Sequence, residues 1–240
     1  MNFEEKVLSG KIPEHIAVIM DGNRRWAKQR SLPTKLGHRE GALRVTDLVR
    51  YCAEIGVKYL SVYAFSTENW KRDKNEIEYL MNLLVEFVFK ELNNLHKNDV
   101  KITMMGNMED LPEKIRKEVE RSIELTKHNE TLHLNIALSY GSRSEIIRAV
   151  KSIIKDCENN EINIEDINEE SFKKYLFTNN MPDPDLLIRT SGEIRLSNFL
   201  LYQLAYTEFY FTEVLWPDFK KDELLKAIEN YQQRKRRYGN

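Results

Sequence analysis

The sequence predicts an α/β protein with a central, mostly parallel sheet of about six strands flanked by helices. Short apolar or β-branched runs alternate along the chain with longer stretches of helical periodicity. Most predicted strands are followed by a stretch long enough for a crossover helix, the connection that parallel strands require. The first run, 16–20, is apolar at every position, as expected of a strand that is buried on both faces.

The elements follow one another without a repeat, a low-complexity tract or a linker, so we expect a single domain over residues 1–240. In the first half, His38 opens a helix whose apolar face continues to Ile55 and which Gly56 closes. A second helix is predicted over 76–97. The strands expected in this half are 16–20, 58–65 and 100–105.

The second half continues the alternation. Pro112 opens a helix in the first turn, where proline is preferred, and the apolar face of this helix continues to Thr126. Alternating apolar residues predict a strand over 132–138, and the polar stretch 158–170 is interpreted as a surface loop. The other expected elements are helices from Ile146 to Ile154, over 171–177 and after Asp218, and strands over 185–190 and 207–211.

The composition indicates a globular protein, because 41% of its 240 residues are hydrophobic. A net charge of −1 gives no indication of nucleic-acid binding. Cys52 and Cys157 are far apart and neither belongs to a CxxC pair, so no zinc site or disulfide is expected and a reducing compartment is the default. No run approaches the ~18 apolar residues that span a bilayer, and the acidic N-terminal segment is unlike a signal peptide. We therefore expect a soluble, cytoplasmic protein.

The segment 15–30 carries the strongest functional signal. Asp21, Gly22 and Asn23 end the first strand immediately before a basic, helix-compatible stretch. A carboxylate at a strand end, a glycine that lets backbone approach a ligand and the N–H groups of a helix start together suit a metal-bound phosphate. An ordinary strand–turn–helix unit with an Asn cap explains the same pattern, so both interpretations stay open here.

Further polar groups follow other predicted strands, and ligands of open parallel sheets bind beyond the carboxyl ends of the strands. Arginines beside hydroxyls and amides are what diphosphate oxygens require, and carboxylates among them suit a bridging Mg²⁺. A lone arginine is more often a structural ion pair, but four that converge on one sheet edge favour a diphosphate site. The candidates are Asp21–Asn23, Arg25, Ser66–Trp70, Arg72, Tyr140–Arg143, Arg189, Arg195, Ser197 and Glu208.

The helix predicted over 76–97 has an unusually broad apolar face that includes Ile77, Leu80, Met81 and Leu84. Such a face is most often part of the core. It would also form one wall of a cavity for a hydrophobic ligand, and the sequence alone does not separate the two. The residues by themselves thus indicate an α/β protein with a Mg²⁺–diphosphate site near a large apolar helix.

Four motifs make the chain similar to the cis-prenyltransferases, and most similar to the bacterial undecaprenyl diphosphate synthases. The similarity extends from Ile12 to Gly239. The motifs are HIAVIMDGNRRWA from His15, YAFSTENW from Tyr63 with Arg72 behind it, LLIRTSGEIRLSNFLLYQLAYTEFYF from Leu186, and LWPDF from Leu215.

The resemblance implies a Mg²⁺-dependent, stepwise condensation of isopentenyl diphosphate onto an allylic diphosphate, with farnesyl diphosphate as the expected primer and each new double bond cis. The implied product is undecaprenyl diphosphate for the cell-wall lipid carrier, and the chain would grow in a hydrophobic tunnel beside the helix over 76–97. A shorter product is one alternative. A non-catalytic lipid-binding partner subunit is another, but such a protein should lack the metal-binding aspartate, and Asp21 is present.

The resemblance also assigns roles to residues. Asp21 would hold Mg²⁺ and Glu208 would supply a second metal ligand. The residue that matches Asn69 accepts a proton in the family, although an amide is a weak base and a diphosphate oxygen is the alternative. The loop 71–75 would be mobile and close over the substrate. The remaining substrate-binding residues are Gly22, Asn23, Arg24, Arg25, Trp26, His38 and Arg72 around the allylic diphosphate, Ser66, Thr67, Glu68 and Trp70 around the reacting carbons, and Arg189, Arg195 and Ser197 on isopentenyl diphosphate.

Three further expectations follow from the resemblance. Thr34 stands where the family usually has a diphosphate-binding arginine, and Lys35 is a candidate substitute. A homodimer is expected, with the aromatic C-terminal third as interface or core, and no nucleic acid. Peripheral contact with the inner face of the membrane would suit release of a long lipid.

Overall fold

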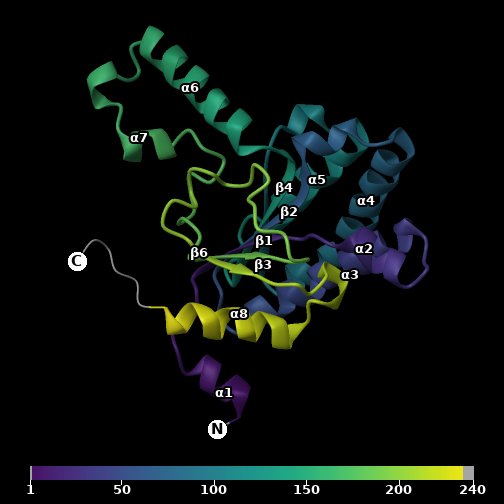
Figure 1. Cartoon of the computed structure of the whole chain (residues 1–240). Coiled ribbons are helices and arrows are strands. Elements are labelled where there is room, and N and C mark those ends of the chain that lie inside the picture. Colours follow the sequence, from purple (N-terminus) through teal and green to yellow (C-terminus); the bar gives the residue numbers. More distant parts are fainter. Residues whose placement is uncertain (1, 235–240) are drawn as a thin grey trace.

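The computed structural model describes residues 2–234, apart from the side chains of residues 87–89. Six strands form one sheet in the order β3-β4-β2-β1-β5-β6, and each neighbouring pair is parallel (Figure 1). The prediction of an α/β protein with about six mostly parallel strands is confirmed. The strands are β1 (His15–Ile19), β2 (Tyr59–Ser66), β3 (Val100–Met105), β4 (Leu132–Tyr140), β5 (Leu186–Arg189) and β6 (Glu208–Phe211).

The predicted helices are present and differ from the predictions near their ends, and the short helix α1 was not predicted. α3 begins at Thr34, four residues before the predicted start at His38, because Pro33 precedes it with a φ of −57° that suits a helix start. The loop predicted over 71–75 is shorter, since a 3₁₀ helix covers Thr67–Lys71 and α4 begins at Lys74. The helices are α1 (Phe3–Leu8), α2 (Asn23–Gln29), α3 (Thr34–Glu54), α4 (Lys74–Lys97), α5 (Glu113–Thr126), α6 (Ser142–Glu158), α7 (Glu169–Lys173) and α8 (Lys221–Gln233).

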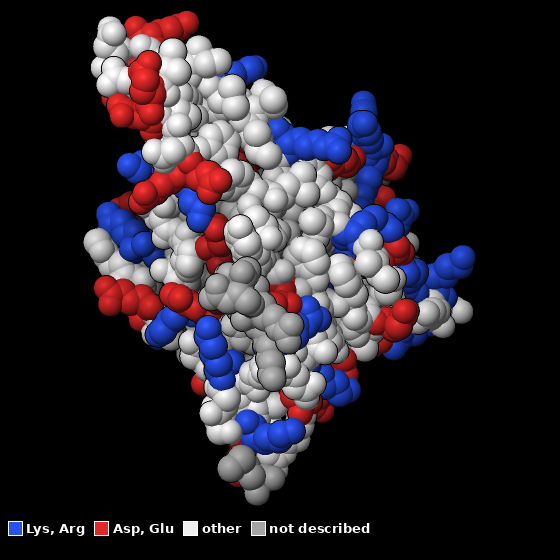
Figure 2. Space-filling model, turned by 60° about the vertical axis from the view of Figure 1, so that its left-hand side comes forward, with Lys and Arg blue, Asp and Glu red and all other residues white. Residues whose placement is uncertain are grey.

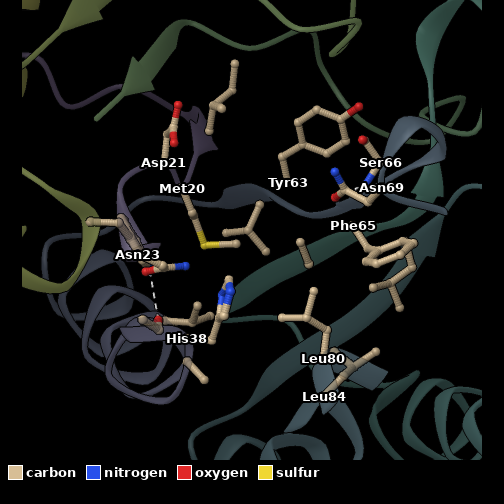
Figure 3. Close-up of a pocket in the computed structure, with 18 of the residues that line it drawn as sticks. Met20, Asp21, Asn23, His38, Tyr63, Phe65, Ser66, Asn69, Leu80 and Leu84 are labelled. Atoms are coloured by element: carbon tan, nitrogen blue, oxygen red, sulfur yellow. Dashed lines mark hydrogen bonds between the residues drawn. The ribbon is translucent and has the colours of Figure 1, made fainter. Parts of the chain in front are cut away.

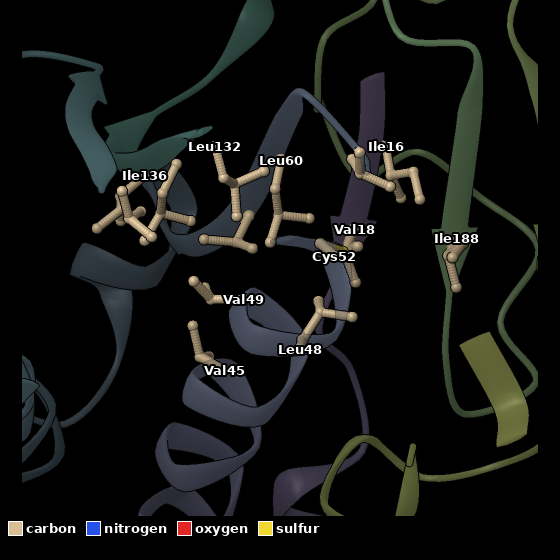
Figure 4. Close-up of a cluster of buried hydrophobic side chains, with 14 of the residues drawn as sticks. Ile16, Val18, Val45, Leu48, Val49, Cys52, Leu60, Leu132, Ile136 and Ile188 are labelled. Atoms are coloured by element: carbon tan, nitrogen blue, oxygen red, sulfur yellow. The ribbon is translucent and has the colours of Figure 1, made fainter. Parts of the chain in front are cut away.

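The sheet has a different cover on each face. Ile16 and Val18 of β1 point into a large core that contains α3 side chains such as Leu48 (Figure 4). Residues of α4, α5 and α8 belong to the same core, so these three helices and α3 share one face of the sheet. Ala17 of β1 points to the opposite face, where the irregular segment 199–204 covers it. β1 is therefore buried on both faces, as its apolar run predicted.

α6 and α7 project from the body of the molecule (Figure 1). Acidic side chains gather at the upper tip of this projection (Figure 2), where exposed acids such as Glu165 and Glu169 follow α6. Ile147 and Ile154 of α6 are 56% and 52% exposed. In the described part of the chain, no helix has the length and apolar composition that a membrane crossing needs.

Candidate active site

The carboxyl end of β1 places Asp21 beside the end of β5. The backbone of Asp21 is fixed on both sides, because its N–H donates to Thr190 Oγ1 at 2.9 Å and its carbonyl accepts from Trp216 N at 3.0 Å. Its carboxylate accepts a hydrogen bond from Arg189 Nη2 at 2.9 Å. Only 4% of the Arg189 side chain is exposed, so Asp21 compensates a buried cation.

Arg189 also organises the loop that follows β5. Its Nη1 donates to the backbone oxygen of Arg195 and to Ser197 Oγ, the latter at 2.7 Å. Arg25 of α2 reaches the same loop and donates to the backbone oxygen of Ser191 at 2.8 Å. We call Asp21, Arg25, Arg189, Glu193, Arg195 and Ser197 the strand-edge cluster.

The start of α2 approaches its neighbours closely. Gly22 has a φ of +111°, and a Cβ there would lie 3.1 Å from Ser191 Cβ, so the turn favours glycine. A Cβ at Gly37 or Gly41 of α3 would lie 2.1 Å and 2.3 Å from oxygen atoms of Asn23. These glycines let α3 pack closely against Asn23, which lines the cavity. Asn23 Oδ1 is buried with no hydrogen-bond partner among the described residues.

A second group of charges joins the starts of α3 and α4. Glu76 Oε1 accepts a hydrogen bond from Arg72 Nη1 at 3.0 Å and lies 3.6 Å from His38 Nε2. Glu76 Oε2 lies 3.7 Å from Arg24 Nη2. Burial lowers the pKa of His38 to about 4. The nearby arginines also lower this pKa, whereas the negative charge of Glu76 raises it. The imidazole is therefore neutral at pH 7. We call Arg24, His38, Arg72 and Glu76 the helix-mouth cluster.

The segment after β2 forms a third side of the site. Asn69 Oδ1 accepts from the Ser66 N–H at 3.0 Å. Trp70 Nε1 donates to Ser139 Oγ at 2.9 Å, which turns this indole toward the protein. Glu68 accepts from Asn198 Nδ2 at 3.0 Å and so ties this segment to the loop after β5.

These walls enclose a cavity of about 310 Å³ (Figure 3). Its polar end is lined by Asp21, Asn23, His38, Ser66, Asn69, Arg72, Arg189 and Ser197. Its other end is apolar and includes Met20, Ala64, Leu80, Leu84 and Ile136. The broad apolar face of α4 therefore contributes both to the core, through Met81 and Val85, and to the wall of a cavity.

Some predicted site residues lie outside the cavity lining. Trp26 Nε1 donates to Asp218 at 2.8 Å and the Arg30 guanidinium lies 4.3 Å from the Trp26 ring centre. Lys35 Nζ lies 5.2 Å from the ring centre of Tyr79, so its substitution for an arginine at Thr34 stays a prediction. Arg25 joins the strand-edge cluster, and its contact with the allylic diphosphate stays a prediction. The lining also lacks six other predicted residues, which are Gly22, Arg24, Thr67, Glu68, Trp70 and Arg195.

Glu208 does not share the site with Asp21 within one chain. In the β5–β6 register, Glu208 pairs with Leu186, whereas Phe211 pairs with Arg189 at the functional edge. Three residues along a strand correspond to ~10 Å, and the Glu208 carboxylate accepts from Arg234 Nη1 at 2.7 Å. Within one chain the structure therefore does not bring Glu208 to Asp21, and the role of Glu208 as a metal ligand stays a prediction.

Sequence analysis missed two carboxylates at the site, Glu76 and Glu193. Glu76 follows Arg72 by four residues, which is the spacing of a helical ion pair and was an available signal. Glu193 lies inside the motif around Arg195, but nothing in its spacing indicates that it contacts Arg25 from α2. Tyr63 was also missed, and its hydroxyl donates to the backbone oxygen of Tyr140 at 3.1 Å.

The site fits Mg²⁺ that arrives with a diphosphate better than it fits a resident metal. Among residues 2–234, no three His, Cys, Asp or Glu side chains are grouped as metal ligands. Asp21 supplies one carboxylate, 31% exposed, at the polar end of the cavity. Mg²⁺ is usually held by one or two carboxylates together with substrate phosphates and water.

A parallel sheet with an arginine-rich polar edge and an adjoining apolar cavity defines a protein that handles an apolar molecule with an anionic head group. Comparison with known proteins gives the family. A family model described as "Putative undecaprenyl diphosphate synthase" matches residues 19–239. The chain belongs to this family, the cis-prenyltransferases, and is an enzyme that transfers prenyl groups.

Individual relatives agree with this assignment. An isoprenyl transferase of Clostridium tetani is 54% identical over 228 residues, which cover 95% of this chain and 89% of the relative. An isoprenyl transferase of Fusobacterium nucleatum is also 54% identical, covering 95% of this chain and 96% of the relative. A crystal structure of lavandulyl diphosphate synthase from Lavandula x intermedia in complex with dimethylallyl diphosphate has a TM-score of 0.93 and 36% identity, with 98% and 100% coverage. A probable undecaprenyl diphosphate synthase from Campylobacter jejuni has a TM-score of 0.79 and 36% identity, with 96% and 100% coverage.

Proposed function

We propose that this enzyme condenses isopentenyl diphosphate stepwise onto farnesyl diphosphate and makes undecaprenyl diphosphate for the cell-wall lipid carrier. The observation that carries the proposal is the presence of two separate arginine clusters at the polar end of one apolar cavity. Two diphosphates and one growing hydrocarbon chain need this arrangement. Residues 1–240 form one catalytic domain, and its two free cysteines suit the cytoplasm, with peripheral contact at the inner membrane face.

In each cycle the allylic carbon loses its diphosphate and bonds to the terminal alkene carbon of isopentenyl diphosphate, which then loses a proton. Negative charge therefore develops on the departing diphosphate. Arg72, with Arg24 beside it, would stabilise this charge at the helix-mouth cluster. Arg189, Arg195 and Ser197 would hold isopentenyl diphosphate for in-line attack. Mg²⁺, when held by Asp21 and diphosphate oxygens, would supply further charge neutralisation.

The proton has two possible acceptors, and we favour a diphosphate oxygen. Asn69 Oδ1 already accepts the Ser66 N–H, and an amide oxygen is a weak base. Asn69 would then act as a catalytic residue through its NH₂ group, which can donate a hydrogen bond to a diphosphate oxygen beside the reacting carbons. The neutral His38 lines the same cavity and offers no competing acid at pH 7.

Chain growth requires the apolar end of the cavity to expand. A volume of 310 Å³ is at the lower end of the range for small-ligand sites, roughly 300–1,000 Å³. α4 supplies Leu80 and Leu84 to one wall, so we propose that α4 moves outward as the chain lengthens. The small cavity and the similarity to a lavandulyl diphosphate synthase support a shorter product as the second candidate.

The test is incubation with farnesyl diphosphate, radiolabelled isopentenyl diphosphate and Mg²⁺, followed by chromatography of the products. Asp21→Asn keeps the shape of the side chain and an acceptor for Arg189 while it removes the metal-binding charge. A long labelled product that Asp21→Asn reduces by about 10³-fold or more supports the proposal. A short product supports the second candidate, and product formation that is unchanged in Asp21→Asn contradicts the role of Asp21.

We also propose that the enzyme is a homodimer. The support is the projecting helix α6, which exposes Ile147, Val150 and Ile154 with the three- and four-residue spacing of one helical face. Of the aromatic residues in the C-terminal third, Phe199 is buried and stacks on Tyr63, which favours the core for that residue. Light scattering of the wild type and of an Ile147→Asp/Ile154→Asp variant tests this proposal, and a monomeric wild type would contradict it.

A further inference from the structure

Glu193 connects the two exposed arginines of the strand-edge cluster. Its Oε1 accepts a hydrogen bond from Arg25 Nη2 at 2.8 Å, and its Oε2 accepts one from Arg195 Nη1. The bond from Arg195 lowers the pKa of the Glu193 carboxyl, so it is ionised at neutral pH. The reaction described above does not use Glu193.

The two arginines that Glu193 neutralises are the ones an incoming anion can reach. The side chains of Arg25 and Arg195 are 46% and 59% exposed. The third arginine, Arg189, is buried and already bonded to Asp21, Ser197 and the backbone of Arg195. Three guanidinium groups against the two carboxylates Asp21 and Glu193 leave the cluster with one positive charge.

We propose that Glu193 is an internal counterion that holds Arg25 and Arg195 in the empty site and is displaced by the diphosphate of the substrate. This inference rests on the proposed function, because it deepens the role of the same cluster. A carboxylate with one oxygen on each guanidinium imitates two oxygens of a diphosphate. The contact is easily broken, since ion pairs between exposed side chains contribute little to stability. Glu193 thereby keeps the arginines ordered but lowers the affinity of the site for any anion.

The proposal predicts that removal of the Glu193 charge tightens diphosphate binding. If Glu193 only stabilised the loop after β5, its removal would disorder Arg195 and weaken diphosphate binding. The two roles therefore predict opposite changes in the Kd for diphosphate when the Glu193 charge is removed. Glu213 provides a matched control, because its carboxylate lies beside Gly192 in the same region and the described residues show no ion pair between it and Arg25 or Arg195.

The experiment is calorimetric titration of the full chain with inorganic pyrophosphate, without Mg²⁺ and with a chelator present. For Glu193→Gln we expect a Kd about threefold to tenfold lower than for the wild type. Glu193→Ala must shift the Kd in the same direction, and Glu213→Gln must leave it within about twofold. A steady-state assay adds a second readout: the KM for isopentenyl diphosphate should fall in Glu193→Gln while kcat does not rise.

Three results would overturn the proposal: an unchanged or higher Kd in Glu193→Gln, an equal effect in Glu213→Gln, or a higher KM for isopentenyl diphosphate. Failure of the proposed function has a different signature. In that case pyrophosphate would bind neither the wild type nor the variants, and the site would have no diphosphate for Glu193 to compete with.

Discussion

The strand-edge cluster and the helix-mouth cluster both pair arginines with a carboxylate, but different secondary-structure elements position them. In each, one carboxylate connects cations: Glu193 joins Arg25 and Arg195, and Glu76 lies between Arg72 and Arg24. Glu76 also lies beside the neutral His38. The strand-edge cluster lies at the ends of β1 and β5, central strands of a parallel sheet. The helix-mouth cluster lies outside the sheet, around the starts of α3 and α4.

The two clusters differ in how firmly they hold their arginines. Arg189 is 4% exposed and has partners on Asp21, Ser197 and the backbone of Arg195. Arg24 is 62% exposed and only approaches its partner, Glu76, at 3.7 Å. Arg72 of the helix mouth is 31% exposed, so this cluster has no arginine as buried as Arg189. We infer that Arg189 gives the strand edge a fixed anchor for one diphosphate, around which the exposed Arg25 and Arg195 exchange partners. The helix mouth adapts to an allylic substrate whose chain lengthens in every cycle.

Among the arginine variants that test this comparison, the largest effect is expected for Arg189→Lys. A lysine keeps the charge but cannot reach Asp21, Ser197 and the Arg195 carbonyl together, because an ammonium lacks the planar fork of a guanidinium. We expect kcat/KM to fall by about 10²- to 10³-fold, measured with saturating Mg²⁺. Activity within threefold of the wild type would show that Arg189 is not the fixed anchor of the strand edge.

The buried His38 of the helix-mouth cluster should make the free energy of unfolding depend on pH. His38 has a pKa lowered to about 4 by burial, so the unfolded chain, with a histidine pKa near 6.5, binds more protons between these values. The stability that His38 confers as a neutral group is therefore present above pH 6.5 and is lost as the pH falls toward 4. At pH 5 this loss is about 2 kcal/mol for one histidine.

Urea unfolding at pH 7 and pH 5 measures this contribution. The wild type should lose more than 2 kcal/mol, since burial also lowers the pKa of His15 and of His133 to about 4. His38→Gln should reduce the difference between the two pH values by about 2 kcal/mol. A His38→Gln variant with the full wild-type difference would contradict the burial of a neutral imidazole at the helix mouth.

The smallest effect is expected for Arg24→Gln. Its contact with Glu76 is long and exposed, and such pairs contribute at most about 1 kcal/mol. The KM for the allylic diphosphate should rise by less than about fivefold, and kcat should fall by less than about fivefold. An effect above tenfold would assign Arg24 a direct substrate contact and would give the helix mouth a fixed anchor like that of the strand edge.

The sheet and most of the polar edge could be predicted because their signals are local. Uniformly apolar runs predict buried strands, and the carboxyl ends of parallel strands meet at one edge, so Asp21, Ser66 and Arg189 were expected together. Their meeting at the polar end of one cavity follows from strand register.

Strand register and contacts between residues far apart in the sequence could not be predicted, because no local sequence pattern determines them. Glu208 is in a predicted strand, but only the pairing with Leu186 shows that it lies three residues along the strand from the position beside Arg189. Glu193 resembles any loop carboxylate until α2 brings Arg25 to it. The start of α3 was missed because the polar residues after Pro33 carry no helical periodicity.

The most direct test of the central claim is a pair of KM values measured for two variants. Arg195→Gln should raise the KM for isopentenyl diphosphate by about 10-fold or more and leave the KM for farnesyl diphosphate within about twofold, while Arg72→Gln should do the reverse. This result would show that the strand edge and the helix mouth bind different diphosphates. If both variants raise the KM of the same substrate, or of both substrates equally, the division of the site into two clusters is wrong.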